Sequence, residues 1–161
     1  MTVAEYNQCV NKFADGVYRF ILKNIKDEER ARDIVQDAFA KMWEKAKDIS
    51  YGKSKSYLFT AAYHTMIDAI RKEKYKVEFD ARLESEHFHE DGYSDLKEIL
   101  EEAVEKLPDV QRSVLMLRDY EGYSYQEIGE ITGLNESQVK VYIYRARIFM
   151  KNYLVSMDRV I

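Results

Sequence analysis

The chain has 161 residues, of which 46% are hydrophobic and 34% charged, with 6 Gly, 1 Pro and 1 Cys. So few turn-forming residues argue against a strand-rich sandwich and favour long helices. The single Cys9 excludes an internal disulfide, and no run approaches the roughly 20 apolar residues of a membrane-spanning helix, so we expect no membrane insertion.

The net charge of −4 is spread unevenly along the chain. Residues 1–77 hold 15 Lys and Arg against 11 Asp and Glu, residues 78–106 hold 3 against 11, and residues 107–161 hold 7 of each. The acidic excess therefore lies in the middle. Because polyanion binding depends on where cations lie more than on their total, the overall charge does not exclude nucleic acid at either end.

Residues 1–77 are predicted to form a small helical domain. Apolar residues recur there at helical spacing in three segments, bounded by the capping residue Asp27, by a loop around Gly52 and by a run of cations. Trp43 lies beside the apolar stripe of the second segment and extends its apolar face. The predicted helices cover residues 3–24, 28–47 and 55–74.

Residues 78–94 are acidic and lack apolar periodicity, so they are predicted to be a flexible linker. Residues 95–161 are predicted to form a second helical domain. Its first two helices cover 95–106 and the stretch from Pro108 to Gly122. A short helix capped by Ser124 then ends at Gly133, and a last helix capped by Asn135 runs to about Val155.

The short helix, the turn and the last helix form a helix-turn-helix pattern over residues 126–147. Gly129 lets the two helices approach closely, and Gly133 supplies the conformation of the turn. A recognition helix needs early residues at base edges and flanking cations at phosphates. The residues of the last helix expected to contact duplex DNA are Glu136, Ser137, Gln138, Lys140, Val141, Tyr144, Arg145, Arg147 and Lys151.

Three segments stand out for their residues and their order along the chain. They are DIVQDAFAKMWEK, residues 33–45, KSYLFTAAYHTMIDAIRKEK, residues 55–74, and LPDVQRSVLMLRDYEGYSYQEIGEITGLNESQVKVYIYRARIFMKNYL, residues 107–154. The first two resemble the second conserved region, and the third resembles the fourth conserved region, of one family, the extracytoplasmic-function sigma factors of bacterial RNA polymerase. The order is right, and an acidic linker stands where the family has one.

The resemblance implies an all-α protein of two small helical domains, 1–77 and 95–161, joined by the acidic flexible linker 78–94. It implies a transcription initiation factor that binds core RNA polymerase and directs it to promoters by reading their −10 and −35 elements. The second-region domain would hold core polymerase and the −10 element, and the helix-turn-helix would read −35 duplex DNA.

The resemblance also assigns residues of the first domain. Those that would dock on the coiled coil of the largest polymerase subunit are Asp33, Gln36, Asp37 and Lys41. The opened −10 strand needs ring faces for base stacking and cations for its backbone. The residues that would supply them, with one histidine among them, are Tyr51, Lys53, Lys55, Tyr57, Tyr63, His64, Arg71 and Lys72.

Three positions depart from common family residues, which are Trp at Tyr57, Asn at His64 and Arg at Tyr142, so we expect promoter choice to differ there. Family members are usually held inactive by an anti-sigma factor, often membrane-bound, and the resemblance implies such a partner. The lone cysteine and the absence of a signal-like N-terminus indicate the cytoplasm.

Three other classes of protein explain the sequence less well. An interaction adaptor made of helices would leave the recognition helix unexplained. A stand-alone helix-turn-helix regulator would need a sensing domain, whereas residues 1–77 read as helices only. An enzyme would need a nucleophile and base, a phosphate loop or a metal cluster. None is visible, and His64, His87 and His89 lack partners at metal-ligand spacing, so we expect no enzymatic activity, metal or cofactor.

Overall fold

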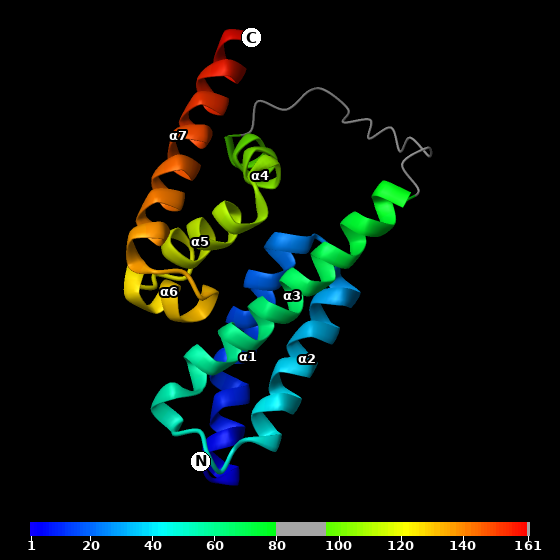
Figure 1. The fold of residues 1–161 in the computed structure, drawn as a ribbon, viewed down its shortest axis with the longest axis vertical. Coiled ribbons are helices and arrows are strands. Elements are labelled where there is room, and N and C mark those ends of the chain that lie inside the picture. The colour runs from blue at the N-terminus through cyan, green and yellow to red at the C-terminus, as the bar shows by residue number, and fades with distance from the viewer. Residues whose placement is uncertain (80–95, 161) are drawn as a thin grey trace.

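The computed structural model describes residues 1–79 and 96–160. In these ranges the regular elements are helical, and they gather into an N-terminal and a C-terminal group (Figure 1). The predicted all-α architecture of two small helical domains is confirmed.

The N-terminal group is a bundle of three helices with a short 3-10 turn before the third. Thr2 caps the first helix in a reciprocal box with Glu5, and the Asp27 carboxylate accepts a hydrogen bond from the Arg30 backbone at the start of the second. Both caps satisfy N–H groups that lack partners inside a helix. The elements are α1 (Val3–Ile25), α2 (Glu28–Glu44), η1 (Tyr51–Lys53) and α3 (Ser54–Phe79).

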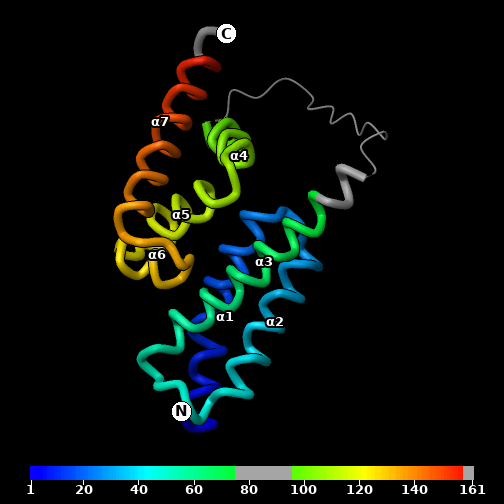
Figure 2. The backbone as a smooth tube through the Cα atoms, viewed as in Figure 1, coloured from blue at the N-terminus to red at the C-terminus, as the bar shows by residue number. Residues whose placement is uncertain are grey.

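The C-terminal group consists of four helices, of which the last is the longest. This helix packs along the other three and runs on past them toward the C-terminus (Figure 2). Side chains from all four helices are buried in the group, which holds the helix-turn-helix pair on a fixed base. The elements are α4 (Leu96–Lys106), α5 (Asp109–Asp119), α6 (Tyr125–Thr132) and α7 (Glu136–Val160).

The predicted boundaries differ from the structure at three helix ends, one of which is the end of the last helix, which runs to Val160 instead of about Val155. The second helix ends at Glu44 instead of residue 47, and Trp43 in its last turn is 52% exposed, with its ring edge-on to Tyr6. Trp43 extends the apolar face only at its margin, because Met42, one residue earlier, is the last fully buried side chain of the helix. Helix α3 continues to Phe79, so it includes the first two residues of the predicted linker 78–94, whose remainder lies outside the described residues.

The two groups also pack on each other, α1 against α5 and α3 against α6. One continuous cluster of buried side chains runs from α1, α2 and α3 into α5, α6 and α7. We call this contact of α1 and α3 with α5 and α6 the closed packing. Among the described residues no helix combines the length and the apolar character that crossing a membrane requires.

Candidate nucleic-acid interface

The helix-turn-helix is built by reciprocal caps on both of its helices. Ser124 and Glu127 exchange two hydrogen bonds at the start of α6, each 3.1 Å long. Asn135 and Gln138 do the same before α7: the Gln138 backbone donates to Asn135 Oδ1 at 2.8 Å, and the Asn135 backbone donates to Gln138 Oε1 at 3.0 Å. Both predicted caps are confirmed, so each helix begins at a defined residue.

Two glycines hold the pair at close range. Gly133 lies in the left-handed region with φ +81°, which a residue with a Cβ adopts only with strain. A Cβ on Gly129 would lie 2.7 Å from the backbone oxygen of Leu134, so only glycine lets α6 approach the turn this closely. The facing side chains are buried as predicted, namely Ile128, Ile131, Val139 and Ile143.

The outer face of α7 carries all nine residues predicted to contact duplex DNA, and each of them is exposed. They surround the side of the helix that points away from the buried Val139, Ile143 and Ala146. A rigid helix with one buried and one open face, presented after a tight turn, is the arrangement that enters a major groove.

Some of these nine side chains already have partners in the protein. Lys140 pairs with Glu136 at 3.4 Å and lies over the Tyr125 ring, and Arg147 pairs with Asp119 at 2.7 Å. Within the described ranges, no hydrogen bond or ion pair holds Arg145 or Lys151. These two are the cations most readily available to phosphate oxygens.

The loop before α3 forms a hollow of about 550 Å³. Its walls include Tyr57, Lys53 and backbone around Gly52, and the Ser54 hydroxyl donates to the Tyr51 carbonyl at 2.6 Å, which ties the loop to the start of α3. Glu130 of α6 also lines the hollow, although it belongs to the C-terminal group. A volume of this size is sufficient for one planar base.

The residues predicted to meet the −10 strand are split between surface and core. Tyr63 is only 5% exposed, and its burial raises the pKa of its phenol, so its ring belongs to the core of the bundle. Tyr51 and Tyr57 are half-buried beside the loop. The exposed members of the set are Lys53, Lys55, His64, Arg71 and Lys72.

The residues predicted to dock on polymerase share one face of α2. Asp33, Gln36 and Lys41 are exposed, and Asp37 is half-buried. Asp37 pairs with Lys41 at 3.0 Å and accepts a hydrogen bond from Thr65 of α3 at 3.3 Å. The packing against α3 therefore holds this polar face in one orientation.

The closed packing engages Lys55 of the predicted −10 surface. The Lys55 ammonium lies 4.6 Å from the centre of the Tyr123 ring, and that ring meets Phe59 edge-on at 5.3 Å. Arg19 of α1 forms two hydrogen bonds with the Glu121 carboxylate, of 3.1 and 3.2 Å. The Arg19–Glu121 pair joins residues 102 positions apart.

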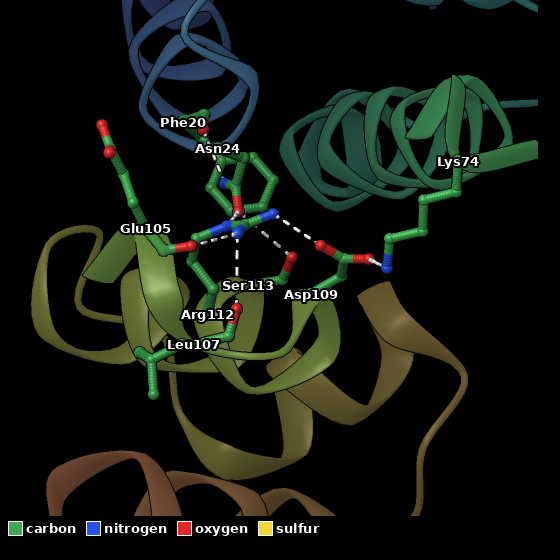
Figure 3. Close-up of polar contacts among 8 residues, drawn as sticks. All are labelled: Phe20, Asn24, Lys74, Glu105, Leu107, Asp109, Arg112 and Ser113. Atoms are coloured by element: carbon green, nitrogen blue, oxygen red, sulfur yellow. Dashed lines mark hydrogen bonds and ion pairs between the residues drawn. The ribbon is translucent and has the colours of Figure 1, made fainter. Parts of the chain in front are cut away.

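A buried polar cluster sits at the centre of the closed packing. Figure 3 shows the Arg112 guanidinium of α5 lying between Asn24 of α1 and the carbonyl oxygens of Glu105 and Leu107. Arg112 is 7% exposed, and its charge is balanced by Asp109 at 2.8 Å. Sequence reasoning did not single out this cluster, although a cation inside the apolar run from Val110 to Leu117 was a visible signal.

Comparison with known proteins matches both groups of helices. The family model described as "Sigma-70 region 2" matches residues 9–75, and the one described as "Sigma-70, region 4" matches residues 97–150. The chain is 31% identical over 153 residues to RNA polymerase sigma factor SigV of Bacillus subtilis, covering 93% of this chain and 91% of that one. It is 30% identical over 152 residues to ECF RNA polymerase sigma factor SigM of the same organism, covering 91% of each.

Two solved structures share the fold. The sigma factor RpoE from Bartonella quintana, solved in complex with the anti-sigma factor NepR, matches with a TM-score of 0.77 at 24% identity, covering 94% of this chain and 98% of that chain. CnrH, solved with the cytosolic domain of CnrY, matches with a TM-score of 0.68 at 22% identity, covering 94% and 88%.

Proposed function

The chain belongs to the extracytoplasmic-function group of RNA polymerase sigma factors, and we propose that its two helical groups divide promoter recognition between them. As a member of this family it is a promoter-specificity factor for transcription initiation and not an enzyme. We assign residues 1–77 to core polymerase and the −10 element, residues 95–161 to the −35 element, and residues 78–94 to the linker between them.

The observation that carries this division is the outer face of α7. All nine predicted contact residues are exposed on it, and the reciprocal caps and glycines hold it in one position. Early residues such as Ser137 would meet base edges of −35 duplex DNA. Arg145 and Lys151 would meet phosphates, which set the register without reading sequence.

The −10 element would be held as an opened strand at the loop before α3. The hollow of about 550 Å³ beside Tyr57 accepts a base out of the stack, and Tyr51 lies next to it. Exposed cations on α3 and the loop follow the strand backbone, as single-strand binding requires. The buried Tyr63 is left out of this surface and supports it from the core.

Core polymerase would dock on the polar face of α2 formed by Asp33, Gln36, Asp37 and Lys41. Three of these side chains are exposed and the fourth is held by Thr65, so the face is both open and ordered. Mixed charges on a fixed helix favour a specific protein partner over a polyanion.

The closed packing has to open during promoter binding. The −10 and −35 elements are named for their positions relative to the transcription start. They therefore lie about 25 base pairs apart, which corresponds to roughly 85 Å along B-form DNA at 3.4 Å per base pair. Helix α6 lies against α3 in the closed packing, where Glu130 lines the −10 hollow and the Lys55 ammonium is held over the Tyr123 ring. We infer that joining core polymerase separates the two groups.

We further propose that an anti-sigma factor binds this protein, because both solved relatives described above were solved with a partner of that kind or with a partner's cytosolic domain. Such a partner need only favour the closed packing to keep the two DNA surfaces from reaching both promoter elements together. The cytoplasm is the compartment that fits a polymerase subunit.

In vitro transcription with core polymerase on genomic fragments, followed by mapping of start sites, tests the proposed function. We expect new start sites that share −10 and −35 sequences. Lys53→Ala should reduce open-complex formation, whereas Lys12→Ala, an exposed lysine of α1 outside every proposed surface, should not. Start sites identical to those of core polymerase alone would overturn the assignment.

One further measurement distinguishes the proposed function from the second candidate, a stand-alone helix-turn-helix regulator. It compares binding to promoter DNA with and without core polymerase. A regulator binds its duplex promoter without polymerase, whereas we expect binding to promoter DNA only after core polymerase is added.

A further inference from the structure

The middle of the DNA-facing side of α7 is apolar. Val141, Tyr144 and Ile148 are 44%, 67% and 42% exposed, which places them among the most exposed large hydrophobic side chains of the described residues. Spaced three and four residues apart, they form one line along the helix. At about 100° per residue this line lies opposite the buried Val139, Ile143 and Ala146.

Charged and polar side chains lie on either side of this line. Lys140 and Lys151 fall on one side and Arg145 on the other, at helical spacing. Cations that flank a helix on both sides suit the two phosphate backbones that border a major groove. Charge complementarity therefore favours DNA over a protein as the occupant of this face, with base edges beneath the apolar line.

The polar residue best placed to read a base is already in use. Gln138 would read adenine with its amide oxygen and its amino group together. Its Oε1 accepts the Asn135 backbone N–H at 3.0 Å, and the Gln138 backbone donates to Asn135 Oδ1 at 2.8 Å. Turning the amide toward adenine would draw Oε1 away from the Asn135 N–H and remove half of the reciprocal cap, so we assign Gln138 to positioning the helix.

Among base edges in the major groove, the apolar feature is the C5-methyl group of thymine. We propose that Val141 and Tyr144 determine −35 specificity by contact with thymine methyl groups. This inference rests on the proposed −35 role of α7 and names what that helix reads. The two residues lie about 4.5 Å apart along the helix, against 3.4 Å per base pair, so the two methyl groups belong to the same or neighbouring steps.

Replacing single thymines by deoxyuridine tests the proposal, because only the methyl group is lost. The probe is a promoter duplex from the start-site mapping, bound by holoenzyme and measured by fluorescence anisotropy. We expect deoxyuridine to weaken binding about three- to fivefold at one or two −35 positions, which is the effect of one buried methyl group. The sensitive positions should lie within about two base pairs of each other.

Protein variants connect each methyl group to a side chain. Val141→Ala should weaken binding to the duplex that contains thymine. It should also remove the effect of deoxyuridine at one position, because the side chain that contacts that methyl group is gone. The affinity lost through the variant and the affinity lost through deoxyuridine should therefore not add. Tyr144→Ala should do the same at the other position, whereas Tyr144→Phe should retain it. Val155→Ala is the matched control, since Val155 is equally exposed on the same helix but about 21 Å further along.

The outcomes separate this proposal from the function on which it rests. If scrambling the −35 element leaves holoenzyme binding unchanged, the −35 assignment of α7 fails and the methyl contacts fail with it. If scrambling abolishes binding but no deoxyuridine has an effect, or if Val141→Ala weakens both duplexes equally, only the methyl proposal is overturned. Because the deoxyuridine arm uses the unaltered protein, it does not depend on the folding of any variant.

Discussion

Asn24 of α1 accepts a hydrogen bond from Arg112 of α5 across the contact between the two helical groups, with Oδ1 3.2 Å from Nε. The same oxygen accepts from the Ser113 hydroxyl at 3.3 Å, and the Asn24 amide donates to the Phe20 carbonyl at 2.8 Å. Every polar atom of Asn24 is therefore used, and the amide is oriented without ambiguity. A buried polar cluster satisfied in this way specifies one docking geometry.

Arg112→Ala should lower the free energy of unfolding by about 3 kcal/mol, because it leaves the carbonyls of Glu105 and Leu107 without their buried donor and removes one of the two cations paired with Asp109. Urea unfolding followed by circular dichroism measures the loss. Lys12→Ala, which changes an exposed cation, should remain within about 0.5 kcal/mol of the original protein. An Arg112→Ala protein as stable as that control would contradict the buried cluster.

The contact between Asn24 and Arg112 should also couple the two groups energetically. In a double-mutant cycle of Asn24→Ala and Arg112→Ala we expect an interaction energy of about 1.5 kcal/mol, as for a hydrogen bond to a charged group. When the same cycle is measured by promoter binding of the holoenzyme, we expect no interaction energy between Asn24 and Arg112. The two groups are then separated, so the two side chains no longer meet. Additive losses in the free protein would mean that the two groups do not pack in solution.

Tyr123→Phe should stabilise the closed packing by about 1 kcal/mol. The Tyr123 hydroxyl is buried and has no hydrogen-bond partner among the described residues, so its removal relieves an unsatisfied group without changing the ring that meets Phe59. Thermal unfolding measures the gain. Tyr120→Phe is a suitable control, because Tyr120 is half exposed and its hydroxyl can reach water.

The same residue predicts how stability depends on pH. Burial raises the pKa of Tyr123 above its ordinary value near 10, so the folded state holds this proton more tightly than the unfolded state. Its contribution is complete below about pH 10 and is lost as pH rises through the raised pKa of the folded state. Between pH 9 and pH 11, the free energy of unfolding should fall less for Tyr123→Phe than for the original protein. Part of the pH dependence of the free energy of unfolding should remain in Tyr123→Phe, because the pKa of Tyr63 is also raised by burial.

Gly129→Ala should destabilise the helix-turn-helix by about 2 kcal/mol or more and weaken −35 binding. The added Cβ would lie 2.7 Å from the Leu134 backbone oxygen, which cannot move without displacing the turn. Gly52→Ala is the matched control for stability, since nothing lies within 4 Å of its Cβ position. Equal stability of the two variants would refute the close approach of α6 to the turn.

Local features of the fold could be predicted because their causes lie within a few residues. The caps at Asp27, Ser124 and Asn135 join atoms three positions apart, and Gly129 and Gly133 act within one turn. The exposed face of α7 could be predicted from the helical spacing of the apolar residues in this segment. The residues of the candidate DNA surfaces could be chosen only with the added resemblance to a family.

Contacts between the two groups could not be predicted in the same way. Asn24 and Arg112 are 88 positions apart, and Arg19 and Glu121 are 102 apart, so nothing in their neighbouring residues indicates the pairing. Tyr63 shows a related difficulty. Its aromatic ring suits either a core or a stacked base, and only the packing of α3 decides that it is buried.

Crosslinking the closed packing should block transcription. We would change Arg19 and Glu121 to cysteine, because their side chains meet across α1 and the turn after α5, and join them with a short bifunctional maleimide. The only native cysteine, Cys9, is buried and should not react. The joined groups cannot span the roughly 85 Å between promoter elements, so we expect start-site-specific transcription to fall at least tenfold. The same pair left unlinked should stay active.

The matched control is a crosslink within one group. Arg30 and Glu73 pair at 2.6 Å between α2 and α3, both in the N-terminal group, so the same reagent on cysteines at these positions leaves the two groups free to separate. Activity retained there and lost in the crosslinked pair at positions 19 and 121 would show that opening is required. Full activity of the latter would mean that the closed packing is compatible with promoter binding, and the inferred separation would then be wrong.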